Sequence, residues 1–409
     1  MKNKRTPDIR FSGFSEEWEV RMLGDLVIDV SRPMKMVDDD IYQLVTVKRR
    51  NGGIVSRGIF KGSEVLVKSQ FIVKSGDYLI SKRQVVHGAN GIVPDYLDGS
   101  IVSNEYLVLH GTKDLSIDFF SLISELPSMY RNFFLSSYGI DIEKLVFNFS
   151  DWKKRKIFIP SISEQHKITS FFEVINNAIT LHQQELTALK QTKQGFLQKM
   201  FPKEGESVPE VRFPGFTGDW EERKLGEMSE SFEYGLNASA TKYDGKNKYI
   251  RITDIDDNTH EFIEDNLTSP NIDVSSAENY LVKEGDILFA RTGASVGKSY
   301  IYDNKDGKVY YAGFLIRARI KSGYDPRFIF QNTLTTKYSE FIKITSQRSG
   351  QPGVNAQEYA NFSIMVPNNE EQTKIGNFFK LLDDTIALHQ RELDALKETK
   401  KAFLQKMFV

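Results

Sequence analysis

Cysteine is absent from the 409-residue chain, which excludes disulfides, cysteine-ligated zinc fingers, iron–sulfur clusters and thiol catalysis. No apolar run approaches the length of about 18 residues that a membrane-spanning helix needs. The first residues are basic but lack the apolar segment of a signal peptide. Proline and glycine are sparse, with 12 and 28 residues, which argues against a disordered or fibrous chain. We therefore expect a globular protein that works in the cytoplasm, without a membrane partner.

The chain also lacks a large net charge of either sign, and its formal net charge is −1. A dedicated, non-specific nucleic-acid binder would be far more basic. Any affinity for nucleic acid must therefore come from local patches, or be shared with partner subunits. Aromatic residues make up 12% of the chain, enough for large hydrophobic cores.

The chain contains an internal repeat, which is best sought before anything else. The segment Pro7 to Gly24 returns as Pro209 to Gly226, with ten of 18 positions identical. A longer segment, Pro160 to Phe201, returns as Pro367 to Phe408, with 24 of 42 positions identical. Between these segments the two copies diverge, so each half combines a retained framework with a variable interior.

The retained C-terminal segment of each half has the pattern of a long helix. Its apolar positions alternate in spacings of four and three, which is the seam of a coiled coil. One such helix cannot bury its apolar stripe alone, and its natural partner is the other copy in an antiparallel pair. The predicted seam consists of Ile168, Phe172, Ile175, Ile179, His182, Leu186 and Leu189 in the first helix, and Ile375, Phe379, Leu382, Ile386, His389, Leu393 and Leu396 in the second.

His182 and His389 lie near the middle of each seam and would approach each other in an antiparallel pair. They could be polar seam residues that fix the register of the two helices. A metal-binding or pH-sensing role is the alternative, and the sequence leaves both open.

The variable interiors are predicted to be α+β. Short β-rich runs are expected at residues 41–47, 77–81 and 101–109 of the first half, and at 249–252, 286–290 and 310–320 of the second. Helices are expected near 116–137 and 325–345. The expected division is a first variable domain over 1–160, a helix over 161–202, a linker with the second variable domain over 203–367, and a second helix over 368–409.

Catalytic motifs are missing, and one loop only imitates a nucleotide site. The run from Arg291 to Ser299 follows a predicted strand, but Gly293 and Gly297 enclose three residues where a phosphate-binding loop needs four. The six histidines lack the spacing of metal ligands. No zinc-protease, nucleophile-elbow, dinucleotide-binding or amino-methyltransferase motif occurs. We expect no catalytic residues and no metal or cofactor on this chain.

Polar side chains suited to reading DNA cluster instead in the loops of each variable domain. Arginine can form bidentate hydrogen bonds to guanine, and asparagine or glutamine to adenine. Any single cluster could equally be a solvated loop. The candidates are Lys48, Arg49, Arg50, Asn51, Lys82, Arg83, Gln84, His87 and Asn90 in the first half, and Arg291, Thr292, Lys298, Gln347, Arg348, Gln351 and Asn355 in the second.

Taken together, the pattern resembles the specificity (S) subunit of type I restriction–modification systems. The resemblance rests on the opening motif around Arg10 and Trp18, on a Gly-Asp-x-Leu-like motif in each half, and on two near-identical helices with shared Leu-His-Gln and Phe-Leu-Gln-Lys-Met-Phe stretches. It covers the whole chain.

The resemblance implies an α+β fold with two similar target recognition domains, separated by two long helices that form an antiparallel coiled coil. Each domain would read one half of a bipartite target on double-stranded DNA, and the coiled coil would set the gap. Two modification (methyltransferase) subunits with S-adenosylmethionine, and two restriction (endonuclease and translocase) subunits with ATP and magnesium, would dock on the chain. The alternative is a non-catalytic coiled-coil scaffold that binds only protein. A candidate docking face carries Gln183, Gln184, Gln191 and Lys199.

Overall fold

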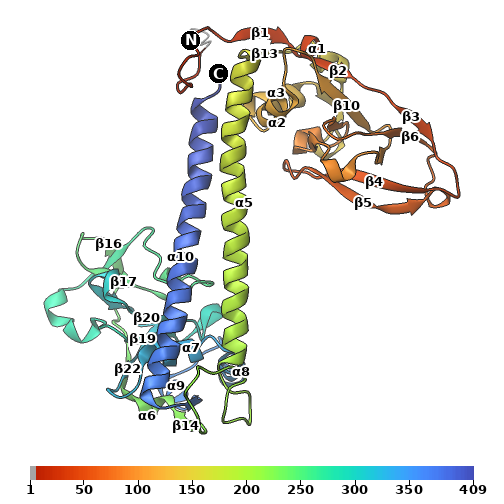
Figure 1. Ribbon diagram of the computed structural model, residues 1–409. Helices are drawn as coiled ribbons and strands as arrows, with labels where there is room; N and C mark the ends of the chain where they lie inside the picture. Colours follow the sequence, from red (N-terminus) through yellow and green to blue (C-terminus); the bar gives the residue numbers. More distant parts are fainter. Residues whose placement is uncertain (1–5) are drawn as a thin grey trace. The chain divides into compact units, whose positions relative to one another are not determined.

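The computed structural model describes residues 6–409, whose contacts divide them into two compact units. The first unit comprises residues 6–180 with Asp394–Val409, and the second comprises Leu181–Leu393. Two 38-residue helices, α5 (Ile162–Lys199) and α10 (Asn369–Lys406), each contribute to both units (Figure 1). Among the described residues, no helix is both long enough and apolar enough to cross a membrane.

Each unit joins the start of its variable domain to the strand just before its long helix. In the first unit β1 (Glu19–Met22) pairs antiparallel with β13 (Lys156–Ile159). In the second, β14 (Glu221–Lys224) pairs in the same way with β23 (Ser363–Val366). Trp18 and Trp220, which precede β1 and β14, are each only 2% exposed. The retained tryptophan is therefore a core anchor of this junction.

Both variable domains contain the same antiparallel four-stranded sheet. In the first unit its order is β2 (Val27–Asp29), β10 (Tyr106–Gly111), β7 (Tyr78–Ser81) and β8 (Asn90–Ile92). In the second it is β15 (Ser229–Tyr234), β22 (Leu315–Ile320), β19 (Ile287–Ala290) and β20 (Ser299–Ile301). The repeat therefore extends into the interiors, although their sequences have diverged.

A buried aspartate precedes the same strand of this sheet in both units. Asp77, before β7, accepts hydrogen bonds from Arg32 at 2.6 and 3.1 Å, and Asp286, before β19, accepts them from Arg319 at 2.9 and 2.7 Å. Burial alone would raise the pKa of Asp77, but hydrogen bonds from Arg32, the Lys74 N–H and His110 outweigh it and lower that pKa. The Gly-Asp motif is therefore a structural ion-pair site.

The additional strands differ between the two variable domains. The first has a five-stranded mixed sheet in the order β3 (Pro33–Lys35), β6 (Ser69–Ile72), β9 (Ile101–Val102), β4 (Ile41–Val47) and β5 (Ile54–Lys61). The second has two separate pairs, antiparallel β16 (Ala240–Lys242) with β18 (Thr268–Pro270) and parallel β17 (Lys248–Ile250) with β21 (Val309–Tyr311). These are the parts in which the two copies have diverged most.

Short helices accompany the shared sheets. The two predicted helical regions, 116–137 and 325–345, contain two of them each, and the other four were not predicted. The first unit has α1 (Leu23–Leu26), α2 (Ile117–Ser124), α3 (Pro127–Leu135) and α4 (Phe149–Trp152), with a small ribbon of β11 (Ser137–Tyr138) and β12 (Val146–Phe147). The second has α6 (Leu225–Met228), α7 (Pro326–Asn332), α8 (Thr336–Thr345) and α9 (Ala356–Ala360). Aromatic residues such as Phe120, Trp152 and Phe328 fill the cores, as the composition indicated.

The long helices run antiparallel where they meet within each unit. In the first unit the rings of Phe171 and Phe403 lie 4.9 Å apart, and in the second those of Phe196 and Phe378 lie 5.0 Å apart. The partner number falls as the α5 number rises, which defines an antiparallel pair. The predicted antiparallel coiled coil is thus confirmed.

The predicted seam residues fall into two environments. Those near the start of each helix, Ile168 and Phe172 on α5 and Ile375 and Phe379 on α10, are at most 2% exposed and belong to the cores of the variable domains. Further along, Leu186, Ile386 and Leu393 are also buried, while Ile179, Leu189, Leu382 and Leu396 are half-buried.

The start of each long helix is clamped by a buried carboxylate. Glu164 on α5 receives two hydrogen bonds from Arg10, both at 2.7 Å. Glu371 on α10 receives two from Arg212, at 2.6 and 2.7 Å. The adjacent glutamines, Gln165 and Gln372, hydrogen-bond backbone groups of the variable domains. The Glu-Gln pair and the opening arginine are therefore retained in both halves because they fix each variable domain to its helix.

Candidate nucleic-acid interface

The first group of candidates lies on the turn between β4 and β5. Arg50 and Asn51 have φ angles of 58° and 53°, in the left-handed region that non-glycine residues adopt uncommonly. The Arg50 N–H donates to the His87 carbonyl at 2.7 Å, and the Asn51 N–H donates to the Gly88 carbonyl at 3.0 Å. These bonds fix the turn against the segment after β7, so two stretches that are distant in sequence form one surface.

That surface surrounds a hollow of about 440 Å³ in the first unit. Arg49 pairs with Glu143 at 2.8 Å, and the Nε2 atom of His87 lies 3.5 Å from the same carboxylate. Tyr130, which is 45% exposed, adds an aromatic face to the rim. The hollow thus presents guanidinium, amide, imidazole and aromatic groups together. The sequence-predicted residues that line it are Arg49, Arg50, Asn51, His87 and Asn90.

Four candidates of the first unit lie outside that cluster, and Asn90, which lines it, is committed to an internal hydrogen bond. Lys82 donates to the Asn104 carbonyl at 2.5 Å, and Arg83 pairs with Glu105 at 2.7 Å. Asn90 is buried, and its side-chain oxygen accepts a 2.6 Å hydrogen bond from Tyr78. Asn90 therefore supports the sheet beneath the hollow. Exposed Lys48 lies on the same turn as Arg49, and half-buried Gln84 on the segment after β7.

In the second unit, Arg291, Thr292 and Gln351 line a wider hollow of about 810 Å³. The guanidinium of Arg291 lies over the rings of Tyr234 and Phe314, at 5.1 and 5.9 Å from their centres. Such stacking orients the planar donor fork and leaves it able to make bidentate hydrogen bonds. Phe314 is 59% exposed, so this aromatic and cationic surface faces solvent.

Lys298 is not a free cation of the loop. Its side chain is only 9% exposed, pairs with Asp257 and donates to the Ile255 carbonyl at 2.9 Å. The segment after β19 leads into the antiparallel strand β20, whereas a phosphate-binding loop leads from a strand into a helix. The hairpin therefore differs from a phosphate-binding loop. The candidate Lys298 has little exposed side chain with which to contact DNA.

The last candidates are grouped around α9. Arg348 makes two hydrogen bonds to Glu358, at 2.5 and 2.7 Å, and Asn355 caps the helix by accepting from the Glu358 N–H at 2.9 Å. Gln347 is exposed. Arg348 and Asn355 therefore have structural partners, while Arg291, Thr292 and Gln351 form the open part of the group.

Sequence reasoning missed several residues around the second hollow. Tyr234, Asn237, Arg251 and Phe314 come from separate strands and connections, so no local motif joins them. One signal was available in the sequence, because the stretch Tyr249–Thr253 begins and ends with the same residues as Tyr42–Thr46 of the first half and contains Arg251. The structure pairs Arg251 with Asp254 through two hydrogen bonds of 2.8 Å.

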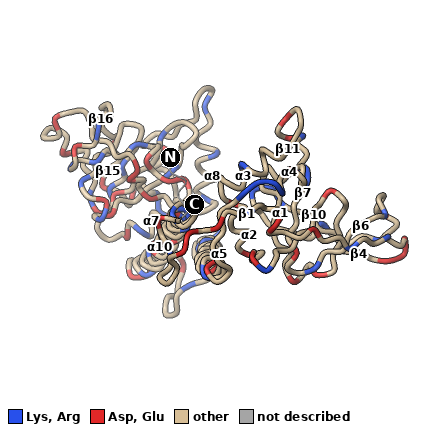
Figure 2. The backbone as a smooth tube through the Cα atoms, turned by 90° about the horizontal axis from the view of Figure 1, so that it is seen from above, with Lys and Arg blue, Asp and Glu red and all other residues tan. Residues whose placement is uncertain are grey.

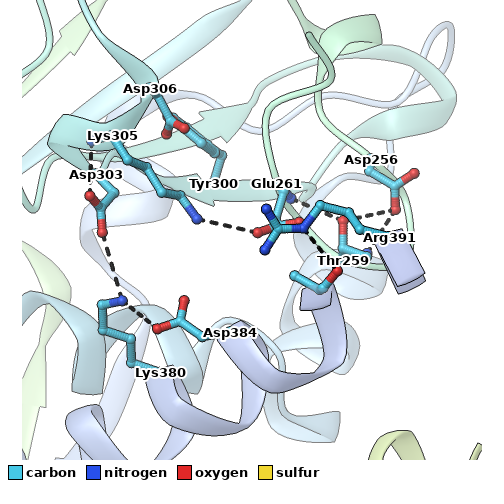
Figure 3. Close-up of polar contacts among 11 residues, drawn as sticks. Asp256, Thr259, Glu261, Tyr300, Asp303, Lys305, Asp306, Lys380, Asp384 and Arg391 are labelled. Carbon is cyan, nitrogen blue, oxygen red and sulfur yellow. Dashed lines mark hydrogen bonds and ion pairs between the residues drawn. The ribbon is translucent and has the colours of Figure 1, made fainter. Parts of the chain in front are cut away.

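Ion pairs within the second unit link its variable domain to α10. Lys380 on α10 pairs with Asp384 at 2.6 Å and lies 4.0 Å from Asp303 of the domain (Figure 3). Lys305 of the same domain reaches Glu261 at 3.4 Å, a contact also visible in Figure 3. Across the helix pair, Lys193 on α5 contacts Asp383 on α10 at 2.5 Å. The Lys380–Asp303 contact thus links the variable domain to α10, and the Lys193–Asp383 contact links the two helices.

Acidic and basic residues are interspersed along the backbone of both units (Figure 2). This agrees with the net charge of −1. Binding to phosphates grows with the number of neutralised charges, so a chain with this balance offers limited electrostatic affinity by itself.

Comparison with known proteins finds the same family of domain in both halves of the chain. The type I restriction modification DNA specificity domain matches residues 15–191 and again residues 217–398. The type I restriction enzyme MjaVIII specificity subunit of Methanocaldococcus jannaschii is 22% identical over 95% of this chain and 91% of its own length. The type I restriction enzyme HindI specificity subunit of Haemophilus influenzae is 25% identical over 47% of this chain and 41% of its own length.

A solved structure shows the same fold. The type I restriction–modification S subunit from M. genitalium aligns over 99% of both chains with a TM-score of 0.66 and 15% identity. The two domain matches together span most of the sequence and follow the internal repeat. This chain therefore belongs to the family of type I restriction–modification DNA specificity subunits.

Proposed function

We propose that this chain selects a bipartite DNA target for a type I restriction–modification complex and is itself non-catalytic. The observation that carries the proposal is the pair of matched specificity domains, each with its own polar hollow. One hollow combines arginine, asparagine and histidine, and the other combines arginine, threonine and glutamine. These groups can hydrogen-bond to base edges in the major groove.

The two hollows read different half-sites because their surroundings differ. The first is built on the turn between β4 and β5, part of a five-stranded sheet that the second domain lacks. The second is built around Arg291 between two aromatic rings. The shared four-stranded sheet is the common scaffold. The antiparallel helices supply the spacer that sets the gap between the half-sites.

Modification subunits dock on the exposed faces of the long helices, and restriction subunits join through the assembled complex. Leu381 and Leu388 on α10 are 67% and 47% exposed, and the equivalent Val174 and Leu181 on α5 are 68% and 54% exposed. Exposed apolar residues at matched repeat positions indicate two equivalent contact surfaces, which supports two modification subunits per chain. The predicted docking residues Gln183, Gln184, Gln191 and Lys199 are also exposed. Methyl donor, ATP and magnesium belong to those subunits.

Exchange of one variable domain tests this assignment. Residues 227–366 are replaced by the corresponding segment of a relative with a different target, and the chain is co-expressed with modification subunits. The expected result is a methylated motif in which one half changes while the other half and the gap stay the same. The matched control exchanges residues 25–159 and should change the opposite half. A change in both halves after a single exchange would contradict separate readers.

A further inference from the structure

Two histidines from opposite long helices face each other in the second unit. The Nδ1 atom of His182 on α5 lies 3.2 Å from the Nδ1 atom of His389 on α10. Each histidine is followed three residues later by a glutamate, Glu185 and Glu392, at equivalent positions of the repeat. Residues three apart lie on the same helix face, so both carboxylates come to the histidine pair.

The carboxylate oxygens lie close to both imidazoles. Glu185 Oε2 is 3.8 Å from His182 Nδ1 and 3.4 Å from His389 Nδ1. Glu392 Oε2 is 3.6 and 3.9 Å from the same two atoms. Each helix therefore contributes one nitrogen and one oxygen to a single cluster.

These separations match the edges of a metal coordination shell. A point equidistant from His182 Nδ1, His389 Nδ1 and Glu185 Oε2 lies about 2.0 Å from each atom, within the range of about 2.0–2.2 Å for zinc bonds to imidazole and carboxylate. Ligand atoms of these three residues lie within 4.8 Å of one another. Glu392 is not one of these three residues, but its Oε2 atom lies 3.6 and 3.9 Å from the two imidazole nitrogens, which makes it the candidate fourth ligand.

Charge and surroundings also favour a dication. A dication at the centre of the cluster would balance the charges of the two neighbouring carboxylates and give the two facing imidazole nitrogens a common partner. The histidine side chains are only 24% and 22% exposed, and Leu186, Ile386 and Leu393 are buried nearby on the same helices. The glutamates are 43% and 45% exposed, which leaves a path for an ion from solvent.

We propose that His182, Glu185, His389 and Glu392 form a binding site for a transition-metal dication of the zinc type. Two imidazole nitrogens with two carboxylate oxygens suit zinc and its neighbours, whereas magnesium and calcium prefer shells of oxygen. The ion would bridge α5 and α10 in the middle of their sequence and lock their register. The proposal concerns the helix pair alone and holds whatever DNA the chain reads.

The first test is zinc titration of the purified full-length chain by calorimetry, with competition from a chromophoric chelator. We expect one high-affinity zinc ion per chain. His182→Gln and His389→Gln should each weaken binding by at least the 10–100-fold that follows loss of an outer-shell partner of a metal ligand. His166→Gln, at an exposed histidine on α5, is the matched control and should bind like the unmodified chain.

A second pair of measurements separates metal ligation from folding. Cobalt in the site should give the visible absorption of a four-coordinate ion, and zinc should raise the melting temperature of the unmodified chain. Both effects should be lost in the Glu185→Gln, Glu392→Gln double variant, whose substitutions are at half-exposed side chains and keep their shape. Zinc affinity that is the same in the unmodified chain and in the histidine variants overturns the proposal. Cobalt absorption unaltered by the double variant overturns the assignment of the glutamates.

Discussion

At the scale of single residues, two buried carboxylates explain why the opening motif of each half is retained. Glu164 and Glu371 are 1% and 0% exposed, and each is satisfied by a bidentate arginine. Removing one partner of a buried pair leaves an uncompensated charge, which costs about 3–5 kcal/mol. Each half therefore uses an arginine near its beginning, Arg10 or Arg212, to hold the start of its own long helix.

Arg212→Met should therefore lower the free energy of unfolding of the second unit by about 3 kcal/mol or more. The measurement is thermal or urea unfolding of the full chain. The matched control is Arg223→Met, because Arg223 and its partner Glu221 are 46% and 72% exposed and such pairs contribute about 0–1 kcal/mol. Equal losses in the two variants would contradict the role of the Arg212 clamp.

Arg291 is the candidate base-reading residue with the best-defined geometry. Arg291→Lys keeps the charge but removes the planar donor fork, so it should cost about 1–3 kcal/mol in target discrimination at one half-site. Methylation of matched and single-mismatch DNA by the reconstituted complex measures this. Arg348→Lys is the contrast, since Arg348 already pairs with Glu358, and it should have a much smaller effect. Loss of both half-sites in Arg291→Lys would argue for unfolding instead.

The sequence predicted which residue types are candidates and which loops carry them, but not which candidates are buried or bonded to other residues. Arg49, Arg50, Asn51 and His87 do meet at one hollow, because the turn between β4 and β5 docks on the segment after β7. The burial of Asn90 and Lys298 depends on partners such as Tyr78 and Asp257, which are distant in sequence. No local pattern contains that information.

At the scale of elements, periodicity predicted the long helices well because their seams repeat over 38 residues. Only the two central strands of each shared sheet fall in predicted runs, β7 and β10 in the first unit and β19 and β22 in the second. The outer strands β2, β8, β15 and β20 were not predicted. The order of strands in that sheet was not predictable, because pairing of β2 with β10 and of β15 with β22 joins distant segments. The same limit applies to the five-stranded sheet.

The exposed leucines of α10 carry a prediction at this scale. Leu381→Ser with Leu388→Ser should weaken binding of modification subunits by about tenfold or more, because burial of one leucine contributes about 1.5–3 kcal/mol. Co-elution on a sizing column and calorimetric titration measure the loss. Arg391→Ser, at an exposed position of the same helix, should leave assembly intact. If the leucine variant assembles as the unmodified chain does, the modification subunits do not dock at Leu381 and Leu388.

At the scale of the whole molecule, the duplicated framework is the feature that connects sequence to function. The two units share a junction, a sheet and a helix clamp, and they differ in the strands and loops that surround their hollows. One chain with a repeated framework and two different sets of surrounding strands and loops is suited to recognise two unlike half-sites. The internal repeat could be read directly from the sequence, whereas the target could not, because the hollows are assembled from distant segments.

The most direct measurement is the methylation pattern of host DNA when this chain is co-expressed with modification subunits. Single-molecule sequencing would locate N6-methyladenine across the genome. We predict a new motif made of two short specific blocks around a gap of fixed length. An intact complex that adds no methylation, or that methylates one continuous block, would contradict the account of a chain with two separate readers.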